Sequence, residues 1–490
     1  MQTVMDRTPT QPSCPPAAVD AQALYVQALQ ALRTGDAEEA ASLLTQTLRW
    51  QPTHQGMRRN LVRALLLAER FEQVLIQVNA ALAETPDDAE LHFARGTALN
   101  ALGQPARACA AFARALSLKP DHAASWLNIG NASADLDDLA SAETLYRTAI
   151  RLDAALPEAH ASLGYILTMQ ARLNEAIEAC EAAIRLRPDF AGAHWNLAIA
   201  ALLGGDLRRG FHAYEWRKRH AAYRADFPDL PGPVWNGADV LGRTILVRAE
   251  QGFGDAIQFA RYLPLIRDAG GKPILVCAPA LVPLMQSLPG IQAVPSTGVL
   301  PEFDAWIDQI SLPRLFGTTL DTIPANDAYL RAEPDRVQVW RLRLPKGPKV
   351  GIAFAGNPKH PADRRRSIPS DLTQMLRDIP GISFVNLHHG KAARLLGLPD
   401  LTQWMTDYAE TAALIDTLDL VITVDTSVAH LAGALGKPVW VLLPHAPDWR
   451  WLLGRTDSPW YRSARLFRQP TPGDWTSVLA DVATKLNLGV

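Results

Sequence analysis

Residues 120–153 read PDHAASWLNIGNASADLDDLASAETLYRTAIRLD, and this stretch is one period of an internal repeat. The same pattern of residue types returns every 34 residues through the amino-terminal half. Repeats of this length indicate stacked supersecondary units. Four aligned columns define the register: Pro52, Pro86, Pro120, Ala154 and Pro188; Ala28, Val62, Gly96, Gly130, Gly164 and Ala198; Ala40, Val74, Ala108, Ala142, Ala176 and Gly210; and Leu44, Val78, Phe112, Tyr146, Cys180 and Tyr214.

These columns predict a pair of antiparallel helices in each unit. Small residues allow two helices to approach closely, and we expect the bulky fourth column to fill the gap to the next pair. Proline ends the second helix because it lacks an amide donor and its ring clashes with the preceding turn. The six units predict an all-helical solenoid over residues 19–220, in which Val62, Val74 and Ala154 indicate looser geometry. Cys180 belongs to a core column, so we expect it to be buried rather than reactive.

Length, charge and cysteine content exclude several classes of protein. The 490 residues allow about three domains, and 48 Lys plus Arg against 50 Asp plus Glu leave a net charge of -2, so no general field attracts nucleic acid. Apolar runs are shorter than the ~20 residues that span a bilayer, and the start MQTVMDRTPTQPSCPP lacks a signal-peptide core. We therefore expect a cytoplasmic protein that is not membrane-spanning. The scattered Cys14, Cys109, Cys180 and Cys277 indicate reduced thiols, without disulfides or a zinc site.

The period changes in the carboxyl-terminal half. Pro and Gly between residues 221 and 242 indicate a linker, and β-branched runs then alternate with amphipathic stretches. This alternation predicts βαβ units in two doubly wound parallel sheets, whose ligands bind at the carboxyl ends of the strands. The expected strands are residues 244–248, 273–277, 305–310, 349–354, 382–387, 420–424 and 439–443. The predicted organisation is a disordered terminus at 1–18, the solenoid at 19–220, a linker at 221–240, and Rossmann-like domains at 241–345 and 346–490.

The first predicted strand leads into a glycine-rich turn, residues 250–255, that opens a helix. We expect Gly252 and Gly254 to adopt conformations closed to other residues and to leave room for a ligand beside the main chain. Asp255 begins the helix, where its carboxylate is a candidate proton acceptor for an attacking hydroxyl. Aspartate is also a common helix cap, so the two roles stay open at this point.

A second turn, residues 425–427, follows the strand LDLVITV. Thr426 and Ser427 precede or begin a helix whose unpaired amides favour a phosphate or diphosphate. Asp425 ends the strand, and His430 lies on the first turns of the helix. His430 is either a contact to a donor phosphate or sugar, or a packed histidine bonded to a neighbouring loop.

Basic residues form a third cluster after the strand KVGIAFAG. Asn357 begins this segment, and Lys359, Arg364, Arg365 and Arg366 follow. Arginines at a strand end can neutralise charge on a nucleoside diphosphate leaving group, although a solvated face is the alternative. Asp448, Trp449 and Arg450 hold the analogous position after the strand VWVLL, where the tryptophan could close over a nucleotide or pack between domains. No Asp-x-Asp pair follows the linker, so we expect no metal.

These motifs resemble those of two known protein families. Trp126, Gly130, Ala142, Tyr146 and Ala149 resemble the tetratricopeptide repeat, whose concave surface usually holds a peptide or protein. The segments EQGFGDAIQFARY, GNPKHPADRRRS, DYAETAALI, DTSVAHLAGALGKPVWVLLP and DWRWLLGRTDSPWYRSARLFRQ resemble heptosyltransferase-type glycosyltransferases. That resemblance implies two Rossmann-like domains of the B-type glycosyltransferase fold, with metal-independent, inverting transfer from a nucleotide sugar and no cofactor.

The resemblance also implies roles for individual residues. Asp255 becomes the candidate general base, and Asp425, Thr426, Ser427 and His430 become the donor-side turn. Thr411 matches a helix-opening segment near the nucleotide, and Asn357, Arg364 and Arg366 complete the predicted donor set. Heptosyltransferases usually have glycine at the position of Ser427, which leaves the donor open. A non-catalytic interaction scaffold and a sugar-nucleotide epimerase are the alternatives.

Overall fold

The computed structural model describes residues 19–324, 327–359, 363–376, 379–388 and 398–487. The predicted disordered terminus and Cys14 lie outside these ranges. The chain divides into two compact units, Met1–Ile166 and Leu167–Val490. The division falls inside a helix of the fifth repeat, so the end of the repeat region belongs to the same unit as both sheets.

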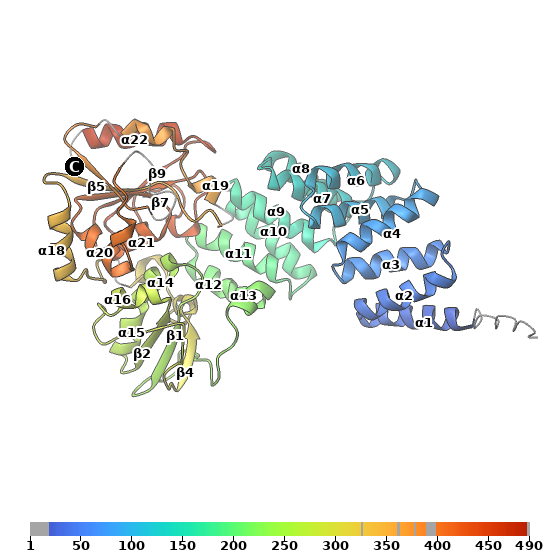
Figure 1. Cartoon of the computed structure of the whole chain (residues 1–490), viewed down its shortest axis with the longest axis horizontal. Coiled ribbons are helices and arrows are strands. Elements are labelled where there is room, and N and C mark those ends of the chain that lie inside the picture. The colour runs from blue at the N-terminus through green and yellow to red at the C-terminus, as the bar shows by residue number, and fades with distance from the viewer. Residues whose placement is uncertain (1–18, 325–326, 360–362, 377–378, 389–397, 488–490) are drawn as a thin grey trace, which may run out of the picture. The chain divides into compact units, whose positions relative to one another are not determined.

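In the described part of the first unit the regular elements are helices, and they follow each other as antiparallel pairs (Figure 1). Aspartate side chains accept hydrogen bonds from first-turn amides at the starts of α2, α5 and α8, which satisfies donors that have no partner within the helix. The helices are α1 (Val19–Thr34), α2 (Ala37–Trp50), α3 (Gln55–Leu67), α4 (Phe71–Glu84), α5 (Ala89–Ala101), α6 (Pro105–Leu118), α7 (Ala123–Asp135), α8 (Leu139–Leu152) and α9 (Pro157–Met169).

The small and bulky columns meet inside each helix pair. A Cβ added to Gly96 would lie 2.5 Å from the Phe112 ring, and one added to Gly130 would lie 2.6 Å from the Tyr146 ring. These distances are too short for any real side chain, so glycine is required where the ring covers the facing helix. The bulky residue therefore packs on its own pair. It also lies toward the next pair, as expected, because Ile129 of α7 packs against the cluster that contains Phe112.

A further periodic contact explains why alanine can replace proline at position 154. The ring nitrogens of His92, Trp126 and His160 each lie 2.9–3.1 Å from the carbonyl oxygen six residues earlier, at Pro86, Pro120 and Ala154. The proline column supplies a backbone carbonyl as acceptor, and any residue type has this group. The helix before it already ends at Leu152, two residues earlier, as the other second helices do before their prolines. Ala154 therefore keeps the contact that joins the loop to the next helix.

The second unit begins with the last repeats. It contains α10 (Leu173–Leu186), α11 (Ala191–Leu203), α12 (Leu207–Tyr214), η1 (Glu215–Arg219) and α13 (Ala221–Asp226). Cys180 is buried in α10, as predicted, and burial raises the pKa of its thiol to about 12. The segment 221–240, predicted as a linker, contains α13 and a stretch that packs on the first sheet: Trp235 is buried and its amide donates to the Trp306 carbonyl at 2.7 Å.

Four parallel strands form the first sheet, in the order β3-β2-β1-β4. Its strands are β1 (Thr244–Arg248), β2 (Lys272–Cys277), β3 (Gln292–Pro295) and β4 (Ala305–Asp308). Its helical segments are α14 (Phe253–Phe259), η2 (Ala260–Tyr262), α15 (Leu263–Asp268), η3 (Pro279–Leu281), α16 (Val282–Met285), η4 (Gln309–Ser311), α17 (Leu312–Leu315) and η5 (Leu320–Thr322). The strand order reverses between β1 and β4, which places the glycine-rich turn at a switch point of the topology.

Five parallel strands form the second sheet, in the order β6-β5-β7-β8-β9. Its strands are β5 (Lys349–Ala353), β6 (Ser383–Asn386), β7 (Leu420–Val424), β8 (Val439–Leu443) and β9 (Ala464–Arg468). Its helical segments are α18 (Pro334–Arg343), α19 (Asp363–Arg366), η6 (Leu372–Leu376), η8 (Thr402–Trp404), α20 (Tyr408–Asp416), α21 (Ser427–Ala434), η9 (Trp449–Trp451) and α22 (Trp475–Asn487). The order reverses between β5 and β7, so the turn at Asp425 also lies at a switch point.

Both faces of the second sheet are covered by helices. Ile422 belongs to a core with Leu479 of α22, whereas Val421 belongs to the core that includes α20 and α21. Figure 1 shows α22 on one side of the strands and α20 with α21 on the other. Burial on both faces explains why these strands read as continuous apolar runs. The prediction of two parallel sheets is confirmed, and β3 and β9 are two strands that the sequence pattern did not reveal.

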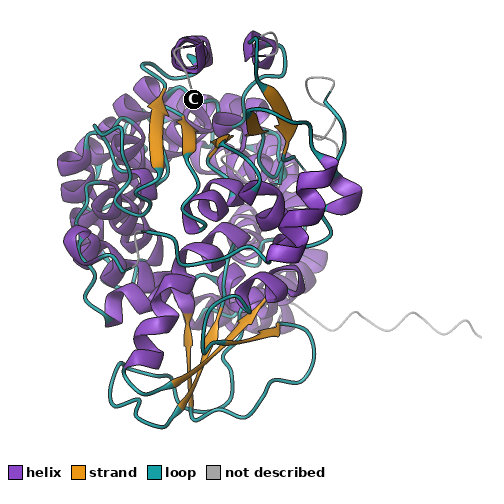
Figure 2. Cartoon of the chain, turned by 90° about the vertical axis from the view of Figure 1, so that its left-hand side faces the viewer, coloured by secondary structure: helices purple, strands orange, loops and turns teal. Residues whose placement is uncertain are grey.

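Helices α14 and α21 bring the two sheet domains together. Figure 2 shows two separate groups of strands with helices between them. A Cβ added to Gly254 of α14 would lie 2.7 Å from Cδ2 of His430 in α21. The missing side chain of Gly254 is therefore the physical condition for this close approach.

Candidate functional site

The glycine-rich turn holds Asp255 by its own backbone. Asp255 is the third residue of α14, and its Oδ2 accepts a hydrogen bond of 2.9 Å from the amide of Gly252. Gly252 has a φ of -92°, and the left-handed residue of this turn is Gln251, with a φ of 62°. The expectation that the two glycines adopt conformations closed to other residues is thus wrong. Gly254 instead makes room for His430.

Arg450 joins Asp255 to the second sheet domain. Its guanidinium contacts Asp255 Oδ1, donates to Asp448 Oδ1 at 2.9 Å and donates from Nε to Gln258 Oε1 at 2.6 Å. Only 9% of the Arg450 side chain is exposed. Trp449 is buried against Phe211 and Trp460, which confirms its packing role. Asp255 therefore faces the other sheet domain, and the Arg450 cation is already bound to it.

The second turn, residues 425–427, follows β7 as the sequence predicted. Thr426 caps α21, its hydroxyl accepting from the Val428 amide at 3.3 Å. The Ser427 hydroxyl lies 2.7 Å from the Tyr408 hydroxyl of α20. His430 is buried, with its Nδ1 2.9 Å from the Tyr461 hydroxyl and its Nε2 3.8 Å from Asp425 Oδ1.

Burial controls the charge of this cluster. Burial raises the pKa of Asp255, and Arg450 opposes that rise. Burial also raises the pKa of Asp425 to about 6, and the nearby Asp448 carboxylate adds to the rise. The pKa of His430 is well below its usual value because the ring is buried and Arg450 lies near it. His430 is therefore neutral at pH 7, whereas the two carboxylates have raised basicity, as a proton acceptor near neutral pH requires.

The basic segment contributes one arginine to this cluster. Arg366 donates from Nη1 to the Asp425 carbonyl at 3.0 Å and from Nε to Asp363 at 3.2 Å. Asn357 and Arg364 are exposed, and the Asn357 side chain accepts from the amide of Lys359 at 3.0 Å. Residues 360–362 of this segment lie outside the described residues. The structure thus brings Arg366, of the predicted basic residues, to the edge that carries Asp425.

Thr411 lies inside the helix-opening segment that the sequence indicated. It is buried in α20, and its hydroxyl donates to the Asp407 carbonyl at 3.1 Å. Asp407 caps the same helix, and Glu410 pairs with Arg336 at 2.7 Å. These contacts give Thr411 a structural partner, whereas the Tyr408 hydroxyl of α20 contacts Ser427 of the second turn.

Sequence reasoning missed three contacts at this site. The Arg450 contact with Asp255 joins positions 195 residues apart. Tyr461 bonds His430 from the segment between β8 and β9. Tyr214 of α12 donates to Gln251 beside the turn at 3.2 Å. Tyr214 belongs to the bulky column of the repeat. No local sequence pattern, however, shows which residue of the following domain this column contacts in the last repeat.

The described residues offer neither a metal cluster nor a membrane-spanning helix. Among them, no group of three or more His, Cys, Asp or Glu is placed to hold a metal ion. His388 accepts from the Phe354 amide at 2.8 Å, and His389 lies outside the described residues. No helix in the part of the chain that the structure describes combines the length and apolarity needed to cross a membrane.

Comparisons with known proteins agree with this architecture. Tetratricopeptide-repeat models match residues 31–95, 75–123, 93–159 and 163–215, and the model for glycosyltransferase family 9 (heptosyltransferase) matches residues 405–460. The chain thus contains segments that match tetratricopeptide repeats and one segment that matches glycosyltransferase family 9, and its two parallel sheets are consistent with the B-type glycosyltransferase fold.

Individual relatives match different parts of the chain. Protein FlbA of Caulobacter vibrioides is 29% identical over 437 residues, which cover 82% of this chain and 73% of FlbA. Among solved structures, the tetratricopeptide-repeat protein TTC0263 of Thermus thermophilus is 22% identical and covers 37% of this chain and 99% of its own, with a TM-score of 0.33. PilF of Pseudomonas aeruginosa is 17% identical over 41% of this chain and 90% of its own, with a TM-score of 0.36.

Proposed function

We propose that this protein is a glycosyltransferase that moves a sugar from a nucleotide-sugar donor to an acceptor hydroxyl, with inversion and without a metal ion. One observation carries the proposal. The segment matched by the glycosyltransferase family 9 model contains both Asp425 and Arg450, and Arg450 contacts Asp255 at the switch point of the other sheet. The residues that the motifs singled out separately thus meet in one charged cluster.

In the proposed reaction the acceptor oxygen attacks the anomeric carbon of the donor. Asp255 takes the hydroxyl proton, a new carbon–oxygen bond forms, and the bond to the diphosphate breaks with its electron pair on the phosphate oxygen. In this proposal that charge is stabilised by the amide end of α21, which Thr426 caps, and by the guanidinium of Arg366, which lies beside Asp425. Raised basicity of Asp255 supports its role because a more basic carboxylate accepts the proton more readily.

Arg450 has to release Asp255 before the carboxylate can accept a proton. A donor diphosphate carries more negative charge than one aspartate and binds arginine in a bidentate manner. Donor binding therefore offers Arg450 a stronger partner and uncovers the base. In this proposal Asp255 becomes active only when the donor is present.

The repeats are proposed to recruit a protein partner or to present the acceptor, because concave surfaces of stacked helix pairs usually bind peptides or proteins. The family match leaves the acceptor class open between a saccharide, a lipid-linked glycan and a protein.

One observation favours a second function, a non-catalytic interaction scaffold. Both carboxylate oxygens of Asp255 already have partners, the Gly252 amide and Arg450. In a scaffold this arrangement would be permanent, and the sheet domains would bind or sense a nucleotide without turnover.

Nucleotide release separates these functions. The full-length protein is incubated with ADP-, CDP-, GDP- and UDP-linked sugars, with and without a cell extract that supplies acceptors, and free nucleoside diphosphate is measured. We expect release from at least one donor, and an Asp255→Asn variant should lose about 10²- to 10⁴-fold in rate while binding that donor normally. Asp457→Asn, at an exposed carboxylate in the matched segment, is the control and should keep the rate. Donor binding without release by the wild type would establish the scaffold.

A further inference from the structure

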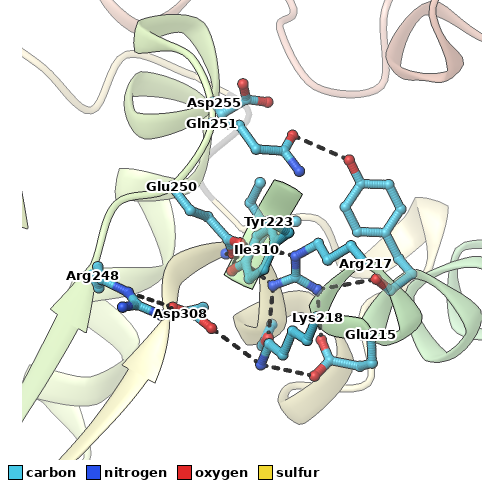
Figure 3. A network of polar contacts seen from close by, with 12 residues as sticks. Glu215, Arg217, Lys218, Tyr223, Arg248, Glu250, Gln251, Asp255, Asp308 and Ile310 are labelled. Carbon is cyan, nitrogen blue, oxygen red and sulfur yellow. Dashed lines mark hydrogen bonds and ion pairs between the residues drawn. The ribbon is translucent and has the colours of Figure 1, made fainter. Parts of the chain in front are cut away.

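A buried polar network joins the last repeat to the turn that carries Asp255. Arg217 of η1 forms a two-pronged contact with Glu250, from Nη2 to Oε1 at 2.6 Å and from Nε to Oε2 at 2.9 Å. The side chain of Arg217 is 1% exposed and that of Glu250 is 0% exposed. Figure 3 shows this pair below Gln251 and Asp255, with dashed lines from the repeat side chains to the sheet domain.

Glu250 is held from several directions. Besides Arg217, it accepts a hydrogen bond from the Ile310 amide at 3.0 Å and one from the Tyr223 hydroxyl of α13. A buried carboxylate needs such partners, because losing one would leave charge in a medium of low polarity. Glu250 follows β1 and precedes Gln251, so its anchoring fixes the first residue of the turn.

Tyr214 holds the next residue of the turn. Its hydroxyl donates to Gln251 Oε1 at 3.2 Å, and Gln251 has a φ of 62°, a left-handed conformation that non-glycine residues seldom adopt. In the fourth repeat the equivalent Tyr146 hydroxyl bonds Asn131 inside the repeats, at 2.8 Å. The same column position thus serves the repeat in one unit and the glycine-rich turn in the last unit.

The backbone of Glu250 and Gln251, which these contacts hold, determines where the Asp255 carboxylate points. Gly252 follows Gln251 directly, and its amide donates to Asp255 Oδ2. Apolar contacts such as Phe211 against Phe259 and Trp449 already dock the last repeat on the sheet domains. Docking of the repeat therefore does not by itself explain the buried Arg217–Glu250 ion pair or the Tyr214–Gln251 hydrogen bond, which hold two successive residues of the turn.

We propose that Tyr214 and Arg217 of the last repeat are positioning residues for Asp255, acting through the backbone of Glu250 and Gln251. This inference rests on the proposed function, in which Asp255 is the base. It makes the end of the repeat region a part of the transfer site rather than an attached binding module. A displacement of about 1 Å at a catalytic group can cost about 10²-fold in rate, so a loosened turn should slow transfer strongly.

Two mild variants test the positioning role in the full-length protein. Tyr214→Phe removes one hydroxyl, and Gln251→Asn keeps an amide that tolerates the left-handed conformation but is one methylene too short to reach Tyr214. The probe is the nucleotide sugar that gives the fastest release in the panel above. We expect each variant to lose about 10- to 100-fold in kcat with less than twofold change in KM for the donor, and the double variant to lose no more than either single one. Tyr146→Phe removes the equivalent hydroxyl in the fourth repeat and should leave kcat unchanged.

Combination with Asp255→Asn distinguishes positioning from general weakening of the structure. If Tyr214 acts through Asp255, Tyr214→Phe should not lower the residual rate of Asp255→Asn any further. An active wild type with an unchanged Tyr214→Phe, or with independent losses in the combined variant, would overturn the positioning role and leave the proposed function intact. Equal rates for an active wild type and Asp255→Asn would remove Asp255 as the base and overturn the positioning role with it, whereas a wild type that binds the donor without releasing nucleotide would overturn the proposed function.

Arg217 is tested by a substitution that keeps its charge. Arg217→Lys retains a cation beside Glu250 but replaces the two-pronged contact by a point charge. We expect an intermediate loss in kcat, again with donor KM within twofold of the wild type. A lysine variant as fast as the wild type would remove Arg217 from the positioning role, since the geometry of the fork would then be irrelevant.

Discussion

Replacement of Arg450 by methionine would remove the cation at the centre of the charged cluster while keeping an unbranched side chain of similar length. The guanidinium contacts Asp255, Asp448 and Gln258, and its carbon lies 4.3 Å from the centre of the Trp449 ring. Methionine can preserve part of the packing on the ring but none of the hydrogen bonds. Breaking a buried ion pair by removing one partner costs about 3–5 kcal/mol, because the remaining charge has no compensation.

The size of this loss should depend on pH. Arg450 opposes the rise in the pKa of Asp255 that burial causes, so the pKa should rise further in the variant. A protonated Asp255 carries no charge, and its burial then costs less. We therefore expect about 3–5 kcal/mol of destabilisation at pH 8 and a smaller loss, about 1–2 kcal/mol, at pH 4.5.

Thermal unfolding of the full-length protein measures this prediction. For a unit of about 320 residues, 3–5 kcal/mol corresponds to about 4–7 °C in Tm. Arg455→Met is the matched control, because Arg455 pairs with the exposed Asp457 and such pairs contribute about 0–1 kcal/mol. An Arg450→Met protein that melts within 1 °C of the wild type, or loses the same stability at both pH values, would refute the assignment of Arg450 as the partner of a buried carboxylate.

Three further substitutions test the packing and the electrostatics. Burial raises the pKa of Asp425 from 3.8 to about 6, so between these pH values the native state binds more protons than the unfolded chain. The native state therefore loses about 3 kcal/mol of stability as the pH rises through this range. Asp425→Asn removes this loss, so thermal melts should show the variant more stable, relative to the wild type, at pH 8 than at pH 4. Gly254→Ala places a Cβ 2.7 Å from the His430 ring and should destabilise the second unit by about 1–3 kcal/mol, with a less than additive loss in combination with His430→Ala; additive losses would show that the ring is not the obstacle. Gly130→Ala places a Cβ 2.6 Å from the Tyr146 ring and should lower the melting temperature measured by circular dichroism, despite the higher helix propensity of alanine. Adding Tyr146→Val to this variant should restore the melting temperature. An unchanged melting temperature in Gly130→Ala would contradict the packing.

The repeat architecture could be predicted because its information is local and periodic. Each unit needs a small residue where two helices meet and a bulky residue over it, and both requirements return every 34 residues, as at Gly96 with Phe112. The strands of the second sheet were also predictable, since burial on both faces leaves continuous apolar runs such as Leu420–Val424. The strand β3 was missed because it has only four residues, with exposed Gln292 and Pro295 at its ends, and β9 was missed because the exposed Arg465 interrupts its apolar pattern.

The candidate site was predictable only in part. Helix starts after strands are local features, so the positions of Asp255 and Thr426 at the beginnings of α14 and α21 followed from the sequence. The tertiary contact that each of these side chains makes could not be predicted from the sequence. Arg364 and Arg366 look equivalent in the sequence, yet Arg366 reaches the Asp425 carbonyl while Arg364 is exposed.

The sequence by itself therefore determined the periodic helices, the two parallel sheets and the turns at their switch points, because hydrophobic period, glycine and proline act over a few residues. The tertiary structure alone decided which charges meet. Arg450 neutralises Asp255, and Arg217 and Tyr214 of the last repeat hold the turn before it, through contacts between segments far apart in the chain. The physical reason is that burial makes an ion pair or hydrogen bond strong only where packing excludes water, and packing between distant segments leaves no pattern in either segment.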